Sequence, residues 1–398
     1  MKPRVLIVTT YYHPVLGGVE THARQIAAHL RASGFGVEVL TKRLGAGDPV
    51  ESRVDDVLVH HAGPAGERSA SGKWRTTPAF FRSMLARRSR YETILCLDYR
   101  GIGIAAVAAG RWLKRPVILQ AETAGVLAGS VDAASSGLAP ESLFGRLARV
   151  PVRAIYRRAD RIVCIGRDLE RESIRGGMPP DRVHYLPPGV DLTRFRPAAA
   201  GERERLRAEL GWPADKTIVL FVGRLSLEKG AMDLIHGWRS IDRRDALLAM
   251  VGPDMPGHPW DVGARGRAYV AEHGLGDRVR FEGAAADTAP FYRAADVFVQ
   301  PSHFEAFGSS ALEAMASGLP VVSSGVGGLA DFVAAGENAV LHEPRSPDSI
   351  ARALTQMLRD AALRRRLAQG AIATARRFEL KGLLDRYVTL IESVAGTR

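Results

Sequence analysis

Short apolar runs alternate along the chain with longer segments whose apolar residues recur at helical spacing. Near the start, the runs 5–8 and 37–40 flank a loop and a segment in which Ala23, Ile26 and Leu30 share one helix face. This order of strand, loop, helix and strand predicts a βαβ unit. Further apolar runs follow at 93–97, 116–119, 161–165 and 184–186. Strands that alternate with helices predict a parallel sheet covered by helices on both faces.

The alternation breaks once, at the turn-rich stretch 187–191, and then resumes. The later apolar runs occupy 218–222, 246–251, 279–281, 297–300 and 320–323. We therefore expect an α/β protein of two Rossmann-like, doubly wound domains, at 1–197 and 198–378, with a last helix at 379–398 that crosses back to the first domain. Ligands of such folds bind at the carboxyl ends of strands and at domain interfaces, which predicts a cleft across which the two domains face each other.

Composition narrows the class of protein. The content of 46% hydrophobic residues suits globular domains with sizeable cores, and the Gly-, Ser- and Ala-rich stretches 65–78 and 128–140 are predicted to be loops. Cys96 and Cys164 lie in apolar runs and are expected to be buried strand thiols. The first residues turn polar too soon for a signal peptide, and no run reaches the ~18 apolar residues of a membrane span. These features predict a cytoplasmic protein.

The formal net charge of +12 attracts nucleic acid, anionic membranes or phosphorylated substrates without choosing among them. The arginines gather in two clusters, which are Arg82, Arg87, Arg88 and Arg90, and Arg146, Arg149, Arg153, Arg157, Arg158 and Arg161. One interpretation is that both are solvated helix faces. The other is peripheral contact of the second cluster, through apolar residues between Leu143 and Tyr156, with the inner face of an anionic membrane. Pro151 interrupts that helical pattern, which favours the first interpretation.

The stretch 301–313, PSHFEAFGSSALE, is the most informative for chemistry. It follows a predicted strand, places Glu305 in a loop, and starts a helix near Gly308, Ser309 and Ser310 with Glu313 one turn inside. Unsatisfied N–H groups and the dipole at such a helix end suit a phosphate, and Glu313 can then reach a ribose. The alternative is a structural cap, in which Ser309 or Ser310 caps the helix and Glu313 completes a capping box.

Two more loops carry candidate ligand contacts. Arg224 and Lys229 lie on a short loop after the first strand of the second domain, where two cations suit a diphosphate that gains charge as it leaves. An exposed basic turn is the alternative for this pair. Gly17 and Gly18, in the first βα loop, permit close approach of backbone to a ligand. A GxGxxG fingerprint of nicotinamide cofactors is missing there.

Taken together, these motifs resemble the large family of retaining glycosyltransferases with the two-domain B fold (GT-B, family 4-like), which includes bacterial mannosyl-, glucosyl- and N-acetylglucosaminyltransferases and sucrose-phosphate synthase. The resemblance covers nearly the whole chain. Its motifs are Gly17-Gly18, Pro188-Gly189-Val190-Asp191, Gly223-Arg224 with Glu228-Lys229-Gly230, Val279-Arg280-Phe281-Glu282-Gly283, and Glu305 with Glu313-Ala314-Met315-Ala316-Ser317-Gly318-Leu319-Pro320.

The resemblance implies an enzyme that moves a hexosyl group, with retention, from a nucleotide-diphosphate sugar to a sugar, lipid-linked or small-molecule acceptor. A UDP-sugar is favoured, and GDP-mannose is next. Arg224 and Lys229 would bind the diphosphate, Glu313 the ribose, and Arg280 the base through its backbone. Glu305 would sit near the transferred sugar, whose hydroxyls would bond the backbone of Ala306, Phe307 and Gly308, and Gly18 would approach the β-phosphate.

One position departs from the family pattern. Many members have a histidine that touches the transferred sugar after the strand that starts at Pro116, whereas this chain has Glu122 there. An ionised carboxylate cannot donate a hydrogen bond, so donor preference or acceptor deprotonation would differ. Pairing of Glu122 with a nearby arginine is the alternative. His13, in the first loop, is a candidate contact or an exposed loop residue.

Cofactor and metal are expected to be absent, because the family needs no metal, no Asp-x-Asp site stands in a plausible loop, and Arg224 and Lys229 can neutralise the diphosphate. Two other function classes compete. One is a sugar-nucleotide epimerase or phosphorylase on the same fold, and the other is a non-catalytic protein that binds anionic lipid or nucleic acid. The second class leaves Glu305 and Glu313 without a role, and no nucleic-acid partner is expected. Acceptor and oligomeric state stay open.

Overall fold

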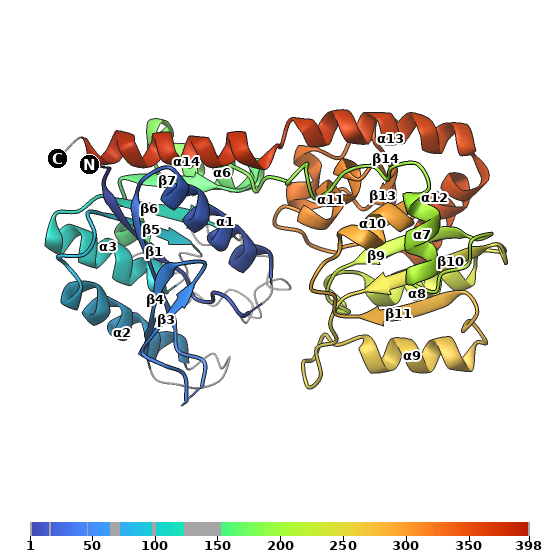
Figure 1. Cartoon of the computed structure of the whole chain (residues 1–398), viewed down its shortest axis with the longest axis horizontal. Coiled ribbons are helices and arrows are strands. Elements are labelled where there is room, and N and C mark those ends of the chain that lie inside the picture. The colour runs from blue at the N-terminus through green and yellow to red at the C-terminus, as the bar shows by residue number, and fades with distance from the viewer. Residues whose placement is uncertain are drawn as a thin grey trace. The chain divides into compact units, whose positions relative to one another are not determined.

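The structure, a computed structural model, describes residues 2–15, 17–45, 47–63, 72–97, 101–122 and 153–396, with side chains of 72–75 excepted. The chain divides into two compact units, each built around a single sheet (Figure 1). The first unit comprises Met1–Pro188 and Lys381–Arg398, and the second comprises Gly189–Leu380.

The first unit contains an eight-stranded sheet in the order β3-β4-β2-β1-β5-β6-β7-β8. Its strands are β1 (Arg4–Val8), β2 (Gly36–Lys42), β3 (Glu51–Val54), β4 (Val57–Ala62), β5 (Thr93–Leu97), β6 (Val117–Ala121), β7 (Arg161–Cys164) and β8 (Val183–Tyr185). All neighbours are parallel except β3 and β4. The central strands are apolar and buried on both faces, as in sheets with helices on each side.

The described helices of the first unit are α1 (Gly18–Ala32), α2 (Gly72–Ala86), α3 (Ile102–Leu113), α6 (Arg167–Arg175) and α14 (Leu380–Ala395). Helix α1 turns Ala23, Ile26 and Leu30 into the core, as the apolar spacing predicts. Helix α14 also packs on this unit, because Tyr387 and Ile391 are buried there and Asp385 binds His29 of α1. The C-terminal segment thus completes the first core.

The second unit contains a six-stranded, fully parallel sheet in the order β11-β10-β9-β12-β13-β14. Its strands are β9 (Thr217–Val222), β10 (Ala246–Val251), β11 (Val279–Gly283), β12 (Val297–Gln300), β13 (Val321–Ser323) and β14 (Ala339–Leu341). Its helices are α7 (Glu202–Glu209), α8 (Ala231–Arg239), α9 (Gly263–Glu272), α10 (Ala289–Ala294), α11 (Ser309–Ala316), α12 (Pro347–Arg359) and α13 (Ala361–Arg376). This strand order is that of a Rossmann fold.

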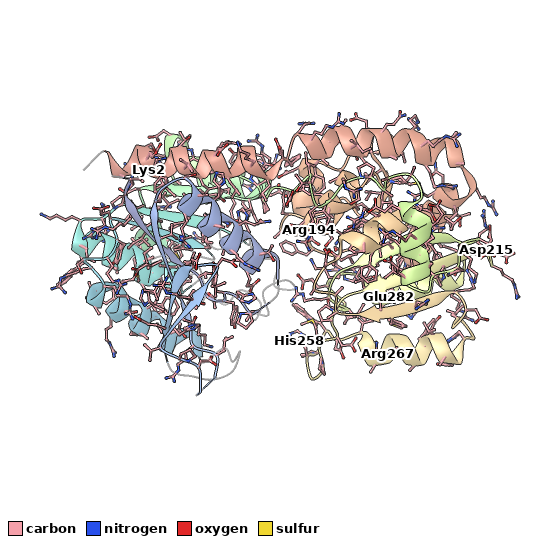
Figure 2. The ribbon with its side chains drawn as sticks, in the orientation of Figure 1. Lys2, Arg194, Asp215, His258, Arg267 and Glu282 are labelled. Carbon is pink, nitrogen blue, oxygen red and sulfur yellow. The ribbon has the colours of Figure 1, made fainter. Side chains whose placement is uncertain are left out.

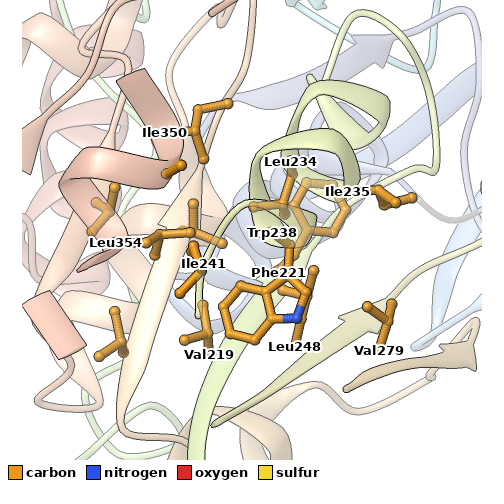
Figure 3. Packing of buried hydrophobic residues seen from close by; sticks show 14 of the residues in the cluster. Val219, Phe221, Leu234, Ile235, Trp238, Ile241, Leu248, Val279, Ile350 and Leu354 are labelled. Carbon is orange, nitrogen blue, oxygen red and sulfur yellow. The ribbon is translucent and has the colours of Figure 1, made fainter. Parts of the chain in front are cut away.

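The core of the second unit is centred on Trp238 of α8, whose side chain is fully buried (Figure 3). Phe221 and Leu248 come to this cluster from the sheet, and Ile350 and Leu354 come from α12. The indole N–H donates a 3.0 Å hydrogen bond to the carbonyl of Arg278, so the large ring leaves no polar group unsatisfied. Helices α8 and α12 therefore cover one face of the sheet and hold it rigid beneath the loops at its carboxyl edge.

Several sequence predictions can be compared with these elements. The two doubly wound α/β folds are confirmed, and Cys96 and Cys164 are buried thiols, as expected of cysteines in strands. The prediction of a loop at 65–78 is wrong for residues 72–78, which begin helix α2 and include Pro78. Residues 65–71 and the predicted loop 128–140 lie outside the described residues.

The chain passes between the units twice, after Pro188 and after Leu380. Within the second unit, Val190 accepts a hydrogen bond from the Leu380 N–H and donates one to the Phe378 carbonyl, at 3.0 and 2.9 Å. A Cβ at Gly189 would lie 2.5 Å from the Leu380 Cα, so only glycine permits this approach. The turn-rich stretch 187–191 is therefore hydrogen-bonded to the segment of the second crossing, residues 378–380.

Candidate active site

The loops that carry the candidate ligand-binding residues follow the two central strands of the second sheet, β9 and β12. The strand order of the sheet reverses between these two strands. Strand β9 runs into the loop with Arg224 and Lys229, and its neighbour β12 runs into the loop with Glu305. Ligands of doubly wound sheets bind at this point, outside the carboxyl ends of the strands. Residues that the sequence places far apart thus come from two adjacent strand ends.

Glycines bring these loops into backbone contact. Gly230 has φ +68, and a Cβ there would lie 2.0 Å from the carbonyl oxygen of Pro301. A third loop, after β13, approaches in the same way, because the Gly328 N–H donates a 2.9 Å hydrogen bond to the Glu305 carbonyl. A Cβ at Gly327 would lie 2.2 Å from that same carbonyl oxygen. Side chains at these positions would push the loops apart, so the loop geometry depends on glycine.

Glu305 and Lys229 form the central ion pair of the site. The Lys229 Nζ lies 2.8 and 2.7 Å from the two carboxylate oxygens of Glu305. Ser302 Oγ and Gln300 Nε2 donate to Oε2 of Glu305 at 3.0 and 3.1 Å. Glu305 is 8% exposed, and Ser302 and Gln300 are buried. A buried carboxylate with three donors is held in one orientation, which is what precise contact with a substrate requires.

Arg224 lies on the same loop and is much more accessible. Its side chain is 48% exposed, and Nη2 lies 3.4 Å from Oε2 of Glu228. This contact is long and weak, so the guanidinium can turn to a ligand at small energetic cost. The loop thus offers one accessible cation and one cation that is shared with a carboxylate.

Helix α11 begins next to these cations without a side-chain cap. Gly308 occupies the N-cap position with φ 101, and no side chain bonds the first turn. The alternative of a capping box with Ser309 or Ser310 is therefore wrong. Phe307 anchors the loop, because its ring packs against Phe332 and Phe378 in the core. The open helix end leaves N–H groups and a positive dipole available to an anion.

Glu313 is bound by a tyrosine of the neighbouring helix α10. The Tyr292 hydroxyl donates a 2.9 Å hydrogen bond to Oε2 of Glu313. Burial raises the pKa of the Glu313 carboxyl to about 7, while Tyr292 and the charge of Arg194 act in the opposite direction. Arg194, labelled in Figure 2, is itself bound to Asp287 at 2.8 Å. Glu313 is thus poised to change protonation near neutral pH.

Arg280 lies on β11, the edge strand of the sheet. Its guanidinium donates to the carbonyl of Gly211 at 2.6 Å and lies 3.2 Å from the carboxylate of Glu282. Glu282, also labelled in Figure 2, accepts from the Trp212 indole at 2.8 Å. The side chain of Arg280 is therefore engaged in holding β11 to the end of α7, and only its backbone is left for a ligand.

The glycine loop of the first unit ends directly at helix α1. Gly17 is the N-cap residue and Gly18 the first helical residue, and no side chain caps this end. Among the described residues, no atom lies within 4 Å of a Cβ built on Gly18. His13 is exposed in the same loop. The space beside Gly18 fits the predicted approach of a ligand to the backbone.

Glu122 directly follows β6 and is 6% exposed. Its Oε1 accepts a short hydrogen bond from the side-chain amide of Gln120, and Gln120 in turn accepts from the Tyr387 hydroxyl at 2.7 Å. The carboxylate is therefore held by a polar chain that enters the unit's interior. The role predicted for Glu122 at the transferred sugar stays a prediction.

The arginine clusters differ in how much of them the structure describes. Arg87 and Arg90 of the first cluster pair with Glu51 and Glu38 at 3.6 and 2.8 Å. Arg146 and Arg149 of the second lie outside the described residues, but Tyr156, near its end, is buried.

Within the described ranges, no helix is long and apolar enough to cross a membrane. The same ranges bring no three His, Cys, Asp or Glu side chains together as potential metal ligands.

Three residues at the site were not foreseen from the sequence. Ser302 and Gln300 hold Glu305, and Tyr292 holds Glu313. Gln300 is the last residue of β12, and a polar residue at the end of an apolar strand is a signal that could have indicated it. Tyr292 stands in an unremarkable helix sequence, and its contact depends on the packing of α10 against α11.

Both units match models of known families. Residues 17–189 match the glycosyl transferase 4-like domain, and residues 202–374 match glycosyl transferases group 1. A D-inositol 3-phosphate glycosyltransferase from Thermomonospora curvata is 32% identical over 96% of this chain and 91% of the relative. A protein of the same name from Acidothermus cellulolyticus is 34% identical over 93% of this chain and 85% of the relative.

Solved structures agree with this assignment. Sucrose-phosphate synthase from Thermosynechococcus elongatus is 25% identical, with a TM-score of 0.82 over 99% of this chain and 100% of the other. HepE of Anabaena, in complex with UDP and glucose, is 21% identical and shares the fold with a TM-score of 0.80 over 98% of this chain and 100% of the other. The chain therefore belongs to the GT-B glycosyltransferases with a 4-like and a group 1 domain, and it is a transferase enzyme.

Proposed function

We propose that the chain transfers a hexosyl group, with retention at the anomeric carbon, from a nucleotide-diphosphate sugar to a hydroxyl acceptor. The observation that carries this proposal is the Lys229–Glu305 ion pair, with Arg224 on the same loop. The uncapped start of α11 follows Glu305 within the same stretch of chain. Cations and a helix N-terminus suit a diphosphate, and an oriented carboxylate suits the hydroxyls of a sugar.

In the proposed reaction, the acceptor oxygen attacks the anomeric carbon from the face that the diphosphate leaves. The bond between that carbon and the β-phosphate oxygen breaks, and the acceptor proton passes to the departing diphosphate. Arg224 and Lys229 stabilise the charge that develops on the diphosphate. Glu305 accepts hydrogen bonds from the sugar, and Glu313 accepts from the ribose. Arg280 serves the base through its backbone, and Gly18 approaches the β-phosphate.

For the donor we favour a UDP-sugar, with GDP-mannose next. HepE, which shares the fold, is described in complex with UDP-glucose. For the acceptor we favour a polyol phosphate, since relatives at 29–34% identity are named D-inositol 3-phosphate glycosyltransferases. The net charge of +12 is consistent with an anionic acceptor. No cofactor takes part in the proposed reaction, because the nucleotide sugar is itself a substrate.

A panel experiment tests this proposal. The purified protein is incubated with UDP-, GDP- and ADP-sugars, alone and with inositol 3-phosphate, inositol or glucose, and release of nucleotide is measured. We expect nucleotide release with one donor, faster with inositol 3-phosphate, and an NMR coupling that shows the anomeric configuration of the donor. An inverted product would refute the mechanism. A new nucleotide sugar without acceptor would indicate an epimerase, and release that needs inorganic phosphate a phosphorylase.

A further inference from the structure

We infer that Tyr387 of the C-terminal helix α14 is a positioning residue for Glu122, and that it acts through Gln120. The inference rests on the proposed function, in which we give Glu122 the contact with the transferred sugar that the sequence predicts for it. Three elements of the first unit meet here: helix α1, the end of strand β6, and helix α14. In Figure 1, α14 runs along the unit beside α1 and the sheet.

The contacts form one continuous chain of buried polar groups. His22 Nε2 lies 3.2 Å from the Tyr387 hydroxyl, which donates to Oε1 of Gln120 at 2.7 Å. The amide nitrogen of Gln120 donates to Oε1 of Glu122. His22 and Glu122 are 4% and 6% exposed, and Tyr387 and Gln120 are 1% and 0% exposed.

The chain has a defined direction. Gln120 offers its amide N–H to Glu122, so its carbonyl oxygen is left to accept from Tyr387. Because the Tyr387 proton is then used, His22 must donate to the tyrosine oxygen through Nε2–H. Burial lowers the pKa of His22 to about 4, so the ring is neutral and supplies that single proton. Every donor in the chain therefore points toward the Glu122 carboxylate.

Such a chain fixes the side chain at its end more strongly than a single contact does. Aligned hydrogen bonds polarise one another in a low-dielectric interior. Without the tyrosine hydroxyl, the buried Gln120 carbonyl would lose its partner, and the amide could turn away from Glu122. A tyrosine that served packing alone would need only its ring, whereas here the hydroxyl donates to the amide group that in turn donates to Glu122.

Tyr91 offers a matched control. Its ring is also buried in the first unit, and its hydroxyl donates a 3.0 Å hydrogen bond to the Met84 carbonyl, away from this chain. Tyr387→Phe and Tyr91→Phe each remove one buried hydroxyl, so both should lower the melting temperature by similar amounts. We expect Tyr387→Phe to lower kcat about three- to tenfold, the loss for one hydrogen bond. Tyr91→Phe should leave kcat within about twofold.

The decisive measurement is a double-mutant cycle. Glu122→Ala, Tyr387→Phe and the double variant are compared in kcat and in urea unfolding. We expect Tyr387→Phe to cause no further loss of kcat when Glu122 is already Ala, because the carboxylate that it positions, and the acceptor of the Gln120 amide, are gone. Additive losses, or an unchanged kcat in Tyr387→Phe, would overturn the inference. If Tyr387→Phe does not fold, Gln120→Met interrupts the same chain and replaces it in the cycle.

The inference and the proposed function can fail separately. If the unaltered protein transfers sugar and the cycle in kcat is additive, the function stands and the positioning role is wrong. If the unaltered protein does not release nucleotide from any of the sugar nucleotides tested, the proposed function fails. The unfolding cycle then still reports whether Tyr387 and Glu122 are coupled, since it needs no turnover. Additivity in that cycle would refute the hydrogen-bonded chain itself.

Discussion

The ammonium of Lys229 lies between the two carboxylate oxygens of Glu305, at 2.7 and 2.8 Å. The two residues come from loops after different strands, β9 and β12, and both side chains are largely buried, at 18% and 10% exposure. Each therefore compensates the charge of the other while no anion is bound. In the proposed reaction a diphosphate would share the lysine, and Glu305 would keep Ser302 and Gln300 as partners while it binds the sugar.

Removal of Lys229 tests the importance of this cation. Loss of one charge-assisted contact to the leaving diphosphate costs about 2–4 kcal/mol in the transition state. At 1.36 kcal/mol per tenfold, Lys229→Ala should lower kcat at least ~30-fold in a steady-state assay of nucleotide release. Lys216, whose Nζ binds the Asp277 carbonyl at 2.9 Å, lies at the opposite end of β9. Lys216→Ala should leave kcat unchanged.

Lys229→Ala also leaves Glu305 as a buried carboxylate without its cation, which lowers the free energy of unfolding. The double variant Lys229→Ala/Glu305→Gln removes both charges and should recover stability without recovering kcat. A normal kcat in Lys229→Ala would contradict the role of Lys229 in stabilising the leaving diphosphate. Recovery of kcat in the double variant would show that stability alone had been lost.

The fold could be predicted where the pattern is strong. The apolar runs 246–251 and 297–300 coincide with β10 and β12. The hairpin of β3 and β4 was missed, because its turn residues Asp55 and Asp56 adopt φ 48 and 59. Such turns normally use Asn-Gly or Asp-Gly, so no glycine marked the turn. Helix α2 was missed because Gly72 and Pro78 are typical of loops.

The sequence indicates which residues form the candidate site, but it does not indicate which of them contact one another. Arg224, Lys229, Glu305 and Glu313 were singled out because each stands beside a strand end or helix start. That Lys229 binds Glu305 depends on the adjacency of β9 and β12, which follows from the reversal of strand order rather than from any local pattern. The bond from Tyr292 to Glu313 likewise joins two helices, and nothing near either residue indicates it.

Gly18→Ala probes the predicted approach of a ligand to the first helix. Because no described atom lies within 4 Å of the added Cβ, and alanine favours helices, the variant should be at least as stable as the unaltered protein. If the β-phosphate approaches this backbone, the methyl group should raise the KM for the donor about tenfold or more, the cost of a steric clash of 1–3 kcal/mol. Gly382→Ala, in open space on α14, is the control. An unchanged KM would exclude Gly18 from the donor site.

Metal dependence is a second property of the proposed donor site. Arg224, Lys229 and the open end of α11 supply the positive charge that a divalent ion supplies in other transferases. We therefore expect nucleotide release at an unchanged rate in excess EDTA. Loss of activity that only Mg²⁺ or Mn²⁺ restores would contradict this, and restoration by Ca²⁺ as well would point to a general effect of ionic strength.

Membrane contact through the second arginine cluster is testable with vesicles. Because Tyr156 is buried, its ring serves the core of the first unit rather than a bilayer. We expect no sedimentation with anionic vesicles beyond that with neutral vesicles, even at low salt, where such attraction is strongest. Binding that disappears at high salt, and in Arg157→Gln/Arg158→Gln, would instead place the protein on a membrane surface.

The raised pKa of Glu313 predicts opposite effects of pH on stability and on ligand binding. Between pH 4.5, the ordinary value, and about 7, the folded protein holds a proton on Glu313 that the unfolded chain has lost. Stability from this group is therefore complete below about pH 4.5 and declines as the pH rises to about 7. Its full size is about 3 kcal/mol, from a pKa shift between 4.5 and about 7. Glu313→Gln carries no such proton, so it should gain stability relative to the unaltered protein at pH 8 but not at pH 4.5.

Ligand binding should strengthen as the pH rises, whereas stability falls. The reason is that ribose hydroxyls donate to the ionised carboxylate of Glu313 in the proposed site. The affinity for UDP should rise as the pH increases from 5 to 7 and level off above, with proton release upon binding near pH 6. Titration calorimetry in two buffers of different ionisation enthalpy measures both quantities. Since histidines titrate in the same range, the informative quantity is the difference between the unaltered protein and Glu313→Gln. An identical pH dependence in the two proteins would remove Glu313 from the ribose contact, because ionisation of its carboxyl, with a pKa raised to about 7, would then have no effect on binding.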